Sequence, residues 1–202
     1  MNYNSAINYS SKILKKNSIK TADIDSEIIL SKSVKLTREQ ILLNLNKELS
    51  SEELKYFKKL FKRRKKKEPI AYIIKKKEFW NKSFMINSDV LIPRPDTEIM
   101  VEEIIKYIPL ESSKSILEIG TGSGCIVLSV LAEREKCCAK AIDISRKALK
   151  VAENNAKIQH LKNRIQFIYS SIDKFYTGKY DLIISNPPYI KSASIKNLDE
   201  DI

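Results

Sequence analysis

Apolar residues repeat with two different periods along this chain, and the change of period separates two regions. Between residues 1 and 67 they recur at helical spacing, as in Leu54, Phe57 and Leu60, which predicts a small all-α domain. Capping-box sequences at residues 37–40 and 50–53 mark two helix starts. Glycine is absent from the first 119 residues, so other residues must close the helix ends. No catalytic pattern appears here, and we interpret this domain as a partner-recognition or packing module.

Residues 68–92 have short apolar runs that are interrupted by lysine and asparagine. The runs at 70–74, 78–80, 84–86 and 90–92 predict short strands, so we expect a β-hairpin linker between two domains. Residues 93–98, Pro-Arg-Pro-Asp-Thr-Glu, then lead into an apolar helix, with Asp96 or Thr97 as its N-cap. Helix capping does not explain why an arginine, Arg94, stands in this segment.

Strands and helices alternate in the rest of the chain, residues 93–202. Apolar runs at 115–119, 138–142, 165–169 and 180–185 predict buried parallel strands. Right-handed crossovers place the second and third strands on one side of the first, so the fourth must return to the other side. The pattern predicts a Rossmann-like α/β sheet of about four parallel strands, with a ligand crevice between the first and fourth.

A glycine-rich loop follows the first of these strands and opens a helix. It consists of Gly120, Thr121, Gly122, Ser123 and Gly124. The second strand ends in an acid that can accept both hydroxyls of a ribose, and an isoleucine after the third strand can cover an adenine; these residues are Asp143 and Ile172. The loop is spaced differently from the dinucleotide fingerprint, and Glu118 in the preceding strand would repel a pyrophosphate but attract a sulfonium. We therefore expect S-adenosylmethionine rather than NAD.

The fourth strand ends in a short polar and aromatic motif, which consists of Asn186, Pro187, Pro188 and Tyr189. The asparagine side chain can accept a hydrogen bond from a substrate N–H, the prolines fix a rigid turn, and the tyrosine can stack on a planar group. An ordinary strand-ending turn is the alternative. The predicted topology brings this motif and the glycine loop to the same crevice.

The net charge of +12 is concentrated in the first part of the chain. Between Lys55 and Lys77 there are 12 basic residues and one acid, Glu68. This segment is either a surface for RNA or for a partner bound near RNA, or a solvated helix end in a lysine-rich protein.

The sequence offers few residues for a metal site or for catalysis by cysteine or histidine. The three cysteines have no metal-ligand spacing and suit a reducing compartment, and the single histidine, His160, lies in a polar stretch. No apolar run is long enough to span a bilayer, and no secretory signal is visible. We expect a monomeric cytoplasmic protein with no bound metal and no membrane contact.

Three motifs resemble the HemK/PrmC release factor glutamine methyltransferases. They are residues 92–98 (Ile-Pro-Arg-Pro-Asp-Thr-Glu), 118–124 (Glu-Ile-Gly-Thr-Gly-Ser-Gly) and 185–190 (Ser-Asn-Pro-Pro-Tyr-Ile). The similarity covers about residues 68–190. It implies a class I methyltransferase domain that transfers a methyl group from S-adenosylmethionine to the glutamine of the Gly-Gly-Gln motif in peptide-chain release factors, in translation termination.

The resemblance also implies roles for individual residues. Asn186 Oδ1 and the Pro187 carbonyl would accept the two N–H bonds of the substrate amide, and Tyr189 would pack on the amide plane. The glycine loop, Asp143, Ile172 and Asn186 would line the cofactor. Holding the amide nitrogen toward the sulfonium methyl would supply most of the rate without a strong base.

The sequence departs from the family pattern at several places. Lys75 and Asn81 stand where the family usually has glycine, and Ser171 stands where it has an acid or amide. The family sheet has three more strands than this sequence supplies, so we expect an incomplete sheet with an exposed fourth strand. An RNA or DNA amino-methyltransferase with the same Asn-Pro-Pro-Tyr chemistry, and an inactive remnant that binds a partner, are the alternatives.

Overall fold

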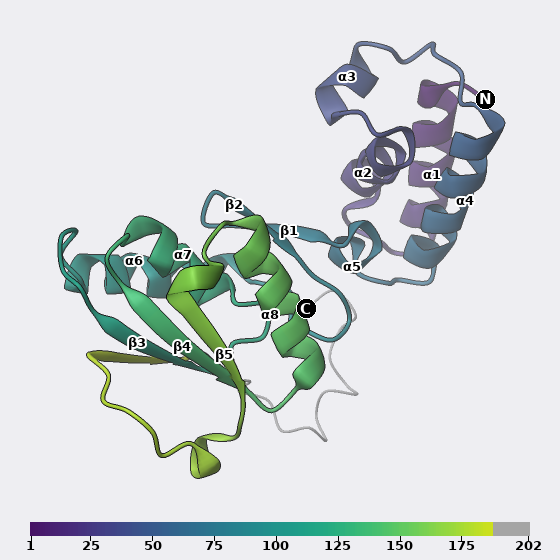
Figure 1. The fold of residues 1–202 in the computed structure, drawn as a ribbon. Coiled ribbons are helices and arrows are strands. Elements are labelled where there is room, and N and C mark those ends of the chain that lie inside the picture. Colours follow the sequence, from purple (N-terminus) through teal and green to yellow (C-terminus); the bar gives the residue numbers. More distant parts are fainter. Residues whose placement is uncertain (188–202) are drawn as a thin grey trace. The chain divides into compact units, whose positions relative to one another are not determined.

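The computed structural model describes residues 1–187, which form two compact units (Figure 1). The first unit contains residues 1–74 and the second begins at Lys75. The division places residues 68–74 with the helices, although the sequence pattern assigned them to a linker. No helix within residues 1–187 is long and apolar enough to cross a membrane.

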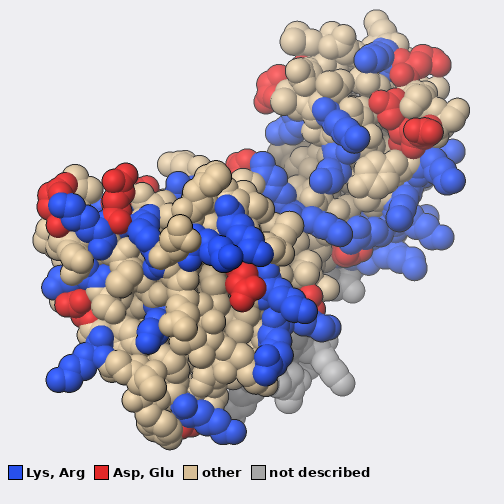
Figure 2. All heavy atoms as spheres, viewed as in Figure 1, with Lys and Arg blue, Asp and Glu red and all other residues tan. Residues whose placement is uncertain are grey.

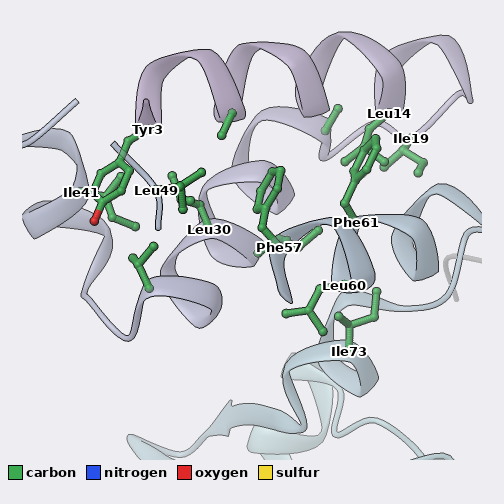
Figure 3. Packing of buried hydrophobic residues seen from close by; sticks show 14 residues of the cluster. Tyr3, Leu14, Ile19, Leu30, Ile41, Leu49, Phe57, Leu60, Phe61 and Ile73 are labelled. Carbon is green, nitrogen blue, oxygen red and sulfur yellow. The ribbon is translucent and has the colours of Figure 1, made fainter. Parts of the chain in front are cut away.

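The first unit consists of five helices around one apolar core (Figure 3). They are α1 (Tyr3–Lys16), α2 (Ala22–Val34), α3 (Arg38–Leu42), α4 (Ser51–Lys65) and α5 (Ile70–Ile74). The two predicted capping boxes are present, at Thr37 and Ser50. Each cap side chain accepts the backbone N–H of the third residue of its helix, and the backbone N–H of each cap residue donates to the side chain of that third residue. The core holds fully buried side chains from separate helices, including Tyr3, Leu30 and Phe57.

Left-handed residues other than glycine close several turns of this glycine-free region. Ser18, Lys35 and Lys67 have φ angles of 61°, 57° and 64°. Lys35 is the C-cap of α2, and its N–H donates to the Ser31 carbonyl. A side chain in this conformation costs about 1–2 kcal/mol per residue, so the helix ends are closed at some expense of stability.

A buried ion pair joins α4 to α2 in the first unit. Arg64 Nε lies 2.8 Å from Asp25 Oδ2, and the two side chains are 3% and 1% exposed. The Thr21 hydroxyl donates to the same carboxylate at 2.7 Å, and Arg64 also donates to the Glu68 carbonyl. Arg63 pairs with the Glu68 carboxylate. Two of the basic residues between Lys55 and Lys77 therefore bind within the unit.

The second unit begins with an antiparallel hairpin of β1 (Lys76–Phe79) and β2 (Lys82–Met85). The turn residues Trp80 and Asn81 have φ angles of 49° and 53°, as a two-residue hairpin turn with primed geometry requires. Two predicted strands are wrong. Residues 70–74 form helix α5, at whose start the Pro69 carbonyl accepts the N–H groups of Tyr72 and Ile73. Residues 90–92 have no regular structure.

The rest of this unit contains a four-stranded parallel sheet, with the strand order β5-β4-β3-β6, and the helices that accompany it. In chain order they are η1 (Pro95–Thr97), α6 (Glu98–Tyr107), β3 (Ser115–Ile119), α7 (Cys125–Glu133), β4 (Cys138–Asp143), α8 (Arg146–Ile158), η2 (Lys162–Arg164), β5 (Ile165–Tyr169), η3 (Ile172–Lys174) and β6 (Leu182–Ser185). Helices α6, α7 and α8 lie on one face of the sheet (Figure 1). The strand order is the one that right-handed crossovers predict, and the α/β fold class is confirmed.

Two arginines bind the carbonyl groups at the ends of α6 and α7. Arg134 is 8% exposed and donates to the carbonyls of Ile105 and Ile108. Arg164 donates to the carbonyls of Leu131 and Arg134 at 2.7 and 2.9 Å. Because the last carbonyls of a helix have no partner within it, these guanidinium groups satisfy them in place of a glycine cap.

Candidate active site

The glycine loop connects β3 to α7 and uses positive φ angles at each of its glycines, 72° at Gly120, 55° at Gly122 and 77° at Gly124. Gly124 is also confined sterically. A Cβ atom there would lie 3.0 Å from Leu128 Cδ1 and 3.3 Å from Ala152 Cβ. The loop therefore packs directly against α7 and α8, and a side chain at Gly124 would push it away from them.

Most backbone N–H groups of this loop already have partners within the fold. Those of Gly120 and Thr121 donate to the Ile142 carbonyl, and that of Gly124 donates to the Thr121 carbonyl at 2.8 Å. The Gly122 N–H donates to Asp143 Oδ2 at 2.9 Å. A pyrophosphate site needs such groups to point at the ligand. This loop is thus suited to a cofactor without phosphates, as the sequence analysis predicted.

Asp143, at the end of β4, holds the loop and the following turn together. Its Oδ1 atom accepts the Ser145 N–H at 2.8 Å, while Oδ2 accepts the Gly122 N–H. A carboxylate has about four lone-pair sites, so roughly two remain for other donors. Two neighbouring hydroxyls, such as those of a ribose, match this remaining capacity.

Glu118 lies under the loop rather than on its surface. Its side chain is 2% exposed and accepts a hydrogen bond from the Thr121 hydroxyl. Burial raises the pKa of Glu118 to about 7, against the opposing effect of the bonds from Thr121 and from the Val127 backbone, and with a smaller contribution from the Asp143 charge. Glu118 therefore supports the start of α7 and is partly protonated near neutral pH.

The predicted loop residues divide into an open and a buried group. Gly120 is exposed and Gly122 is half-buried, whereas Thr121 and Ser123 are 5% and 3% exposed. Ile172, after β5, is 50% exposed at the same edge of the sheet. Ile144 directly follows Asp143 and is 73% exposed, and the sequence analysis did not identify it. An apolar residue that follows a strand-ending acid is the signal that could have found it.

Asn186 and Pro187 follow β6, which pairs with β3 on the side opposite to β4. The register pairs Ser185 with Ile119, so the asparagine follows β6 where the glycine loop follows β3. Asn186 Nδ2 lies 3.4 Å from Thr97 Oγ1. The glycine loop, the motif that begins at Asn186 and the segment that contains Thr97 thus lie at the same edge of the sheet. The position of Thr97 at this edge was not predicted from the sequence. Pro188 and Tyr189 lie outside the described residues.

Several other chemistries lack a basis in the part of the chain that the structure describes. No group of three or more histidine, cysteine, aspartate or glutamate side chains there could hold a metal ion. The cysteines are free, with Cys125 and Cys137 buried and Cys138 exposed. His160 is exposed just after α8.

Two family models match this chain. Residues 5–74 match a model described as the PrmC N-terminal domain, and residues 95–200 match the methyltransferase small domain. The first match covers the helical unit and the second covers most of the sheet and the strand-end motifs.

Curated relatives extend over nearly the whole chain. A release factor glutamine methyltransferase from Buchnera aphidicola subsp. Baizongia pistaciae is 38% identical over 97% of this chain and 70% of its own length. One from Caulobacter vibrioides is 36% identical over 94% of this chain and 66% of its own length. A bifunctional methyltransferase from Rickettsia felis is 39% identical, but the chain spans only 39% of that protein.

Solved structures resemble the sheet more distantly. A Pyrococcus abyssi tRNA (uracil-54, C5)-methyltransferase in complex with S-adenosyl-L-homocysteine has a TM-score of 0.46 and 16% identity, over 56% of this chain and 28% of that one.

Proposed function

Because this chain belongs to the release factor glutamine methyltransferase family, we propose that it methylates the side-chain amide of the glutamine in the Gly-Gly-Gln motif of a peptide-chain release factor, with S-adenosylmethionine as methyl donor. One observation carries the proposal beyond the family name. The glycine loop after β3 and Asn186 after β6 lie at neighbouring strand ends, at the point where the strand order reverses. Ligands of open α/β sheets bind at this point.

The residues on the cofactor side fit an adenosine that carries a sulfonium instead of phosphates. The loop N–H groups of Gly120, Thr121, Gly122 and Gly124 are satisfied internally. Asp143 keeps lone pairs for ribose hydroxyls, and Ile172 offers an exposed apolar side chain at the edge where an adenine would lie. S-adenosylmethionine supplies an electrophilic methyl group in this site.

On the substrate side, Asn186 and Pro187 orient a poor nucleophile. The lone pair of an amide nitrogen is delocalised, so its reaction depends on being held in line with the methyl carbon. Asn186 Oδ1 and the Pro187 carbonyl are the two acceptors for its N–H bonds. Thr97 Oγ1 accepts from Asn186 Nδ2, which helps to orient the carboxamide. Tyr189 is proposed to pack on the amide plane, although it lies outside the described residues.

The transfer balances without a metal or a strong base. The amide nitrogen forms a bond to the methyl carbon, the sulfur–methyl bond breaks, and its electron pair remains on sulfur. The nitrogen then loses one of its two protons to solvent while the Asn186 and Pro187 oxygens hold it. The products are S-adenosylhomocysteine and an N5-methylated glutamine.

A labelled-methyl assay tests the proposal. We expect the chain to label a purified release factor, but not the same factor with its Gly-Gly-Gln glutamine replaced by alanine. Asn186→Ala should lower labelling by two orders of magnitude or more, whereas Asn163→Ala, on the exposed surface of η2, should match the unchanged chain. Label in RNA or DNA but not in the release factor would replace this function by the amino-methyltransferase alternative. Absence of any cofactor binding would favour the inactive remnant.

We propose in addition that the basic face of α4 contacts RNA while the release factor is bound. Lys58, Lys59 and Lys62 are exposed on this helix, and Figure 2 shows Lys and Arg side chains gathered on the helical unit. Phosphate contacts by lysine weaken steeply with salt. Replacing these three lysines by glutamate should abolish salt-dependent RNA binding, whereas replacing Lys12 and Lys16 of α1 should not. If the α4 variant and the α1 variant bind RNA equally well, the proposed contact between α4 and RNA is wrong. We expect the protein to act as a monomer in the cytoplasm.

A further inference from the structure

Asn155 is a fully buried polar side chain that the proposed reaction does not use. It lies on α8 and is 0% exposed. Its neighbour Asn154 is exposed on the same helix. A buried amide is costly unless it is hydrogen-bonded, so the partners of Asn155 indicate what it does.

The Asn155 carboxamide joins three segments that are distant in sequence. Its Oδ1 atom accepts the Met85 N–H at 2.7 Å, and Nδ2 donates to the Met85 carbonyl at 2.9 Å. Nδ2 also donates to the Ser123 carbonyl at 2.9 Å. The amide thus pairs with the free edge of β2 as a peptide group of another strand would, and its second N–H holds the glycine loop.

The same face of α8 contacts the loop one residue further on. Ala152, one helical turn before Asn155, would lie 3.3 Å from a Cβ atom at Gly124. The two contacts fix successive loop residues, since Ser123 is held by a hydrogen bond and Gly124 by close packing. The neighbouring Gly122 and Gly120 carry the open surface of the loop.

We propose that Asn155 is a positioning residue for the cofactor loop, which it holds in its binding conformation by connecting the Ser123 carbonyl to the hairpin strand β2. Asn155 is too deeply buried to touch the cofactor and acts through the loop. Only an amide of this length provides the acceptor and both donors that Met85 and Ser123 require. Aspartate has the same shape but no donors, and it would place a charge against two carbonyl oxygens.

The first measurement is hydrogen exchange of the cofactor-free chain, which does not depend on the proposed function. Asn155→Asp and the smaller Asn155→Ser should increase exchange in peptides that cover residues 82–86 and 120–124. Peptides from residues 1–74 and from β5 should remain unchanged, and Asn154→Asp and Asn154→Ser should behave as the unchanged chain. Exchange that is unaltered at the loop, or that rises equally throughout the sheet, would overturn the proposal.

The second measurement rests on the proposed function, because it uses S-adenosylhomocysteine as probe. By calorimetry we expect its Kd to rise about tenfold in Asn155→Ser, which corresponds to about 1.4 kcal/mol for unsatisfied buried groups. In steady-state assays the KM for S-adenosylmethionine should rise more than kcat falls, because Asn186 and Pro187 lie on another strand. An unchanged Kd would contradict the positioning role. If the unchanged chain does not bind the probe, the proposed function fails, while the exchange experiment still decides the role of Asn155.

Discussion

Replacing Glu118 by glutamine should change how the stability of the second unit depends on pH. Burial raises the pKa of this carboxyl from 4.5 to about 7. Each pH unit between the unfolded and folded pKa values is worth about 1.4 kcal/mol, so the difference corresponds to about 3 kcal/mol. Glutamine keeps the side-chain shape and an acceptor for the Thr121 hydroxyl, but it cannot ionise.

The sign of the effect follows from the two protonation states. Below pH 4.5 the carboxyl is neutral in both the folded and the unfolded chain and costs nothing. As the pH rises from 4.5 to 7, the unfolded chain loses the proton while the folded chain keeps it, so the unfolded state is favoured. Above pH 7 the full cost is present. Wild-type stability should therefore fall, relative to Glu118→Gln, as the pH rises through this window.

The assay is urea unfolding at pH 5 and pH 8, followed by the fluorescence of Trp80, the chain's single tryptophan, which lies in the second unit. We expect the free energy of unfolding of Glu118→Gln, relative to that of the wild type, to be roughly 2–3 kcal/mol higher at pH 8 than at pH 5. Glu153→Gln, at an exposed position of α8, should follow the wild type at both. A stability difference between Glu118→Gln and wild type that is equal at pH 5 and pH 8 would refute the reasoning.

Three further predictions concern separate parts of the chain. Thr97→Val removes an acceptor of Asn186 Nδ2 and should slow methyl transfer about fivefold, whereas Thr97→Ser should retain most of the rate. Equal rates for Thr97→Val and the wild type would contradict the role of the hydroxyl. Arg64→Met leaves a buried aspartate without its arginine and should destabilise the helical unit by about 3–5 kcal/mol in far-UV circular dichroism melts, while exposed Lys65→Met should melt as wild type. Lys75→Gly relieves a left-handed residue, with φ of 59°, and should stabilise the chain by up to about 1 kcal/mol; an unchanged or lower Tm would contradict this.

The parts of the fold that depend on local pattern were predicted from the sequence. The runs at 115–119, 138–142 and 165–169 form strands β3, β4 and β5, and both capping boxes begin helices. The strand order followed from the handedness of crossovers, with the fourth strand returning to the other side of the first. Lys75 and Asn81, where the resemblance led us to expect glycine, take positive φ angles of 59° and 53°, which residues other than glycine adopt less readily.

The failures occurred where a short apolar run has no period long enough to distinguish helix from strand. Residues 70–74 were predicted as a strand and form α5, in which Ile73 is 2% exposed and belongs to the helical core. The division into two units by contacts therefore falls after Ile74. Packing against other helices decided the conformation, and nothing within the five residues could.

The sequence by itself determined the four strands of the parallel sheet, the glycine loop, the strand-ending Asp143 and Asn186, and the edge of the sheet at which they gather. Only the tertiary structure decided that Thr97 meets Asn186 across 89 positions and that Asn155 holds Ser123 and Met85 across 32 and 70. The physical reason is that periodicity and turn chemistry act between near neighbours in the chain. A side-chain hydrogen bond over such separations depends on the distance and orientation of atoms that only the folded packing brings together.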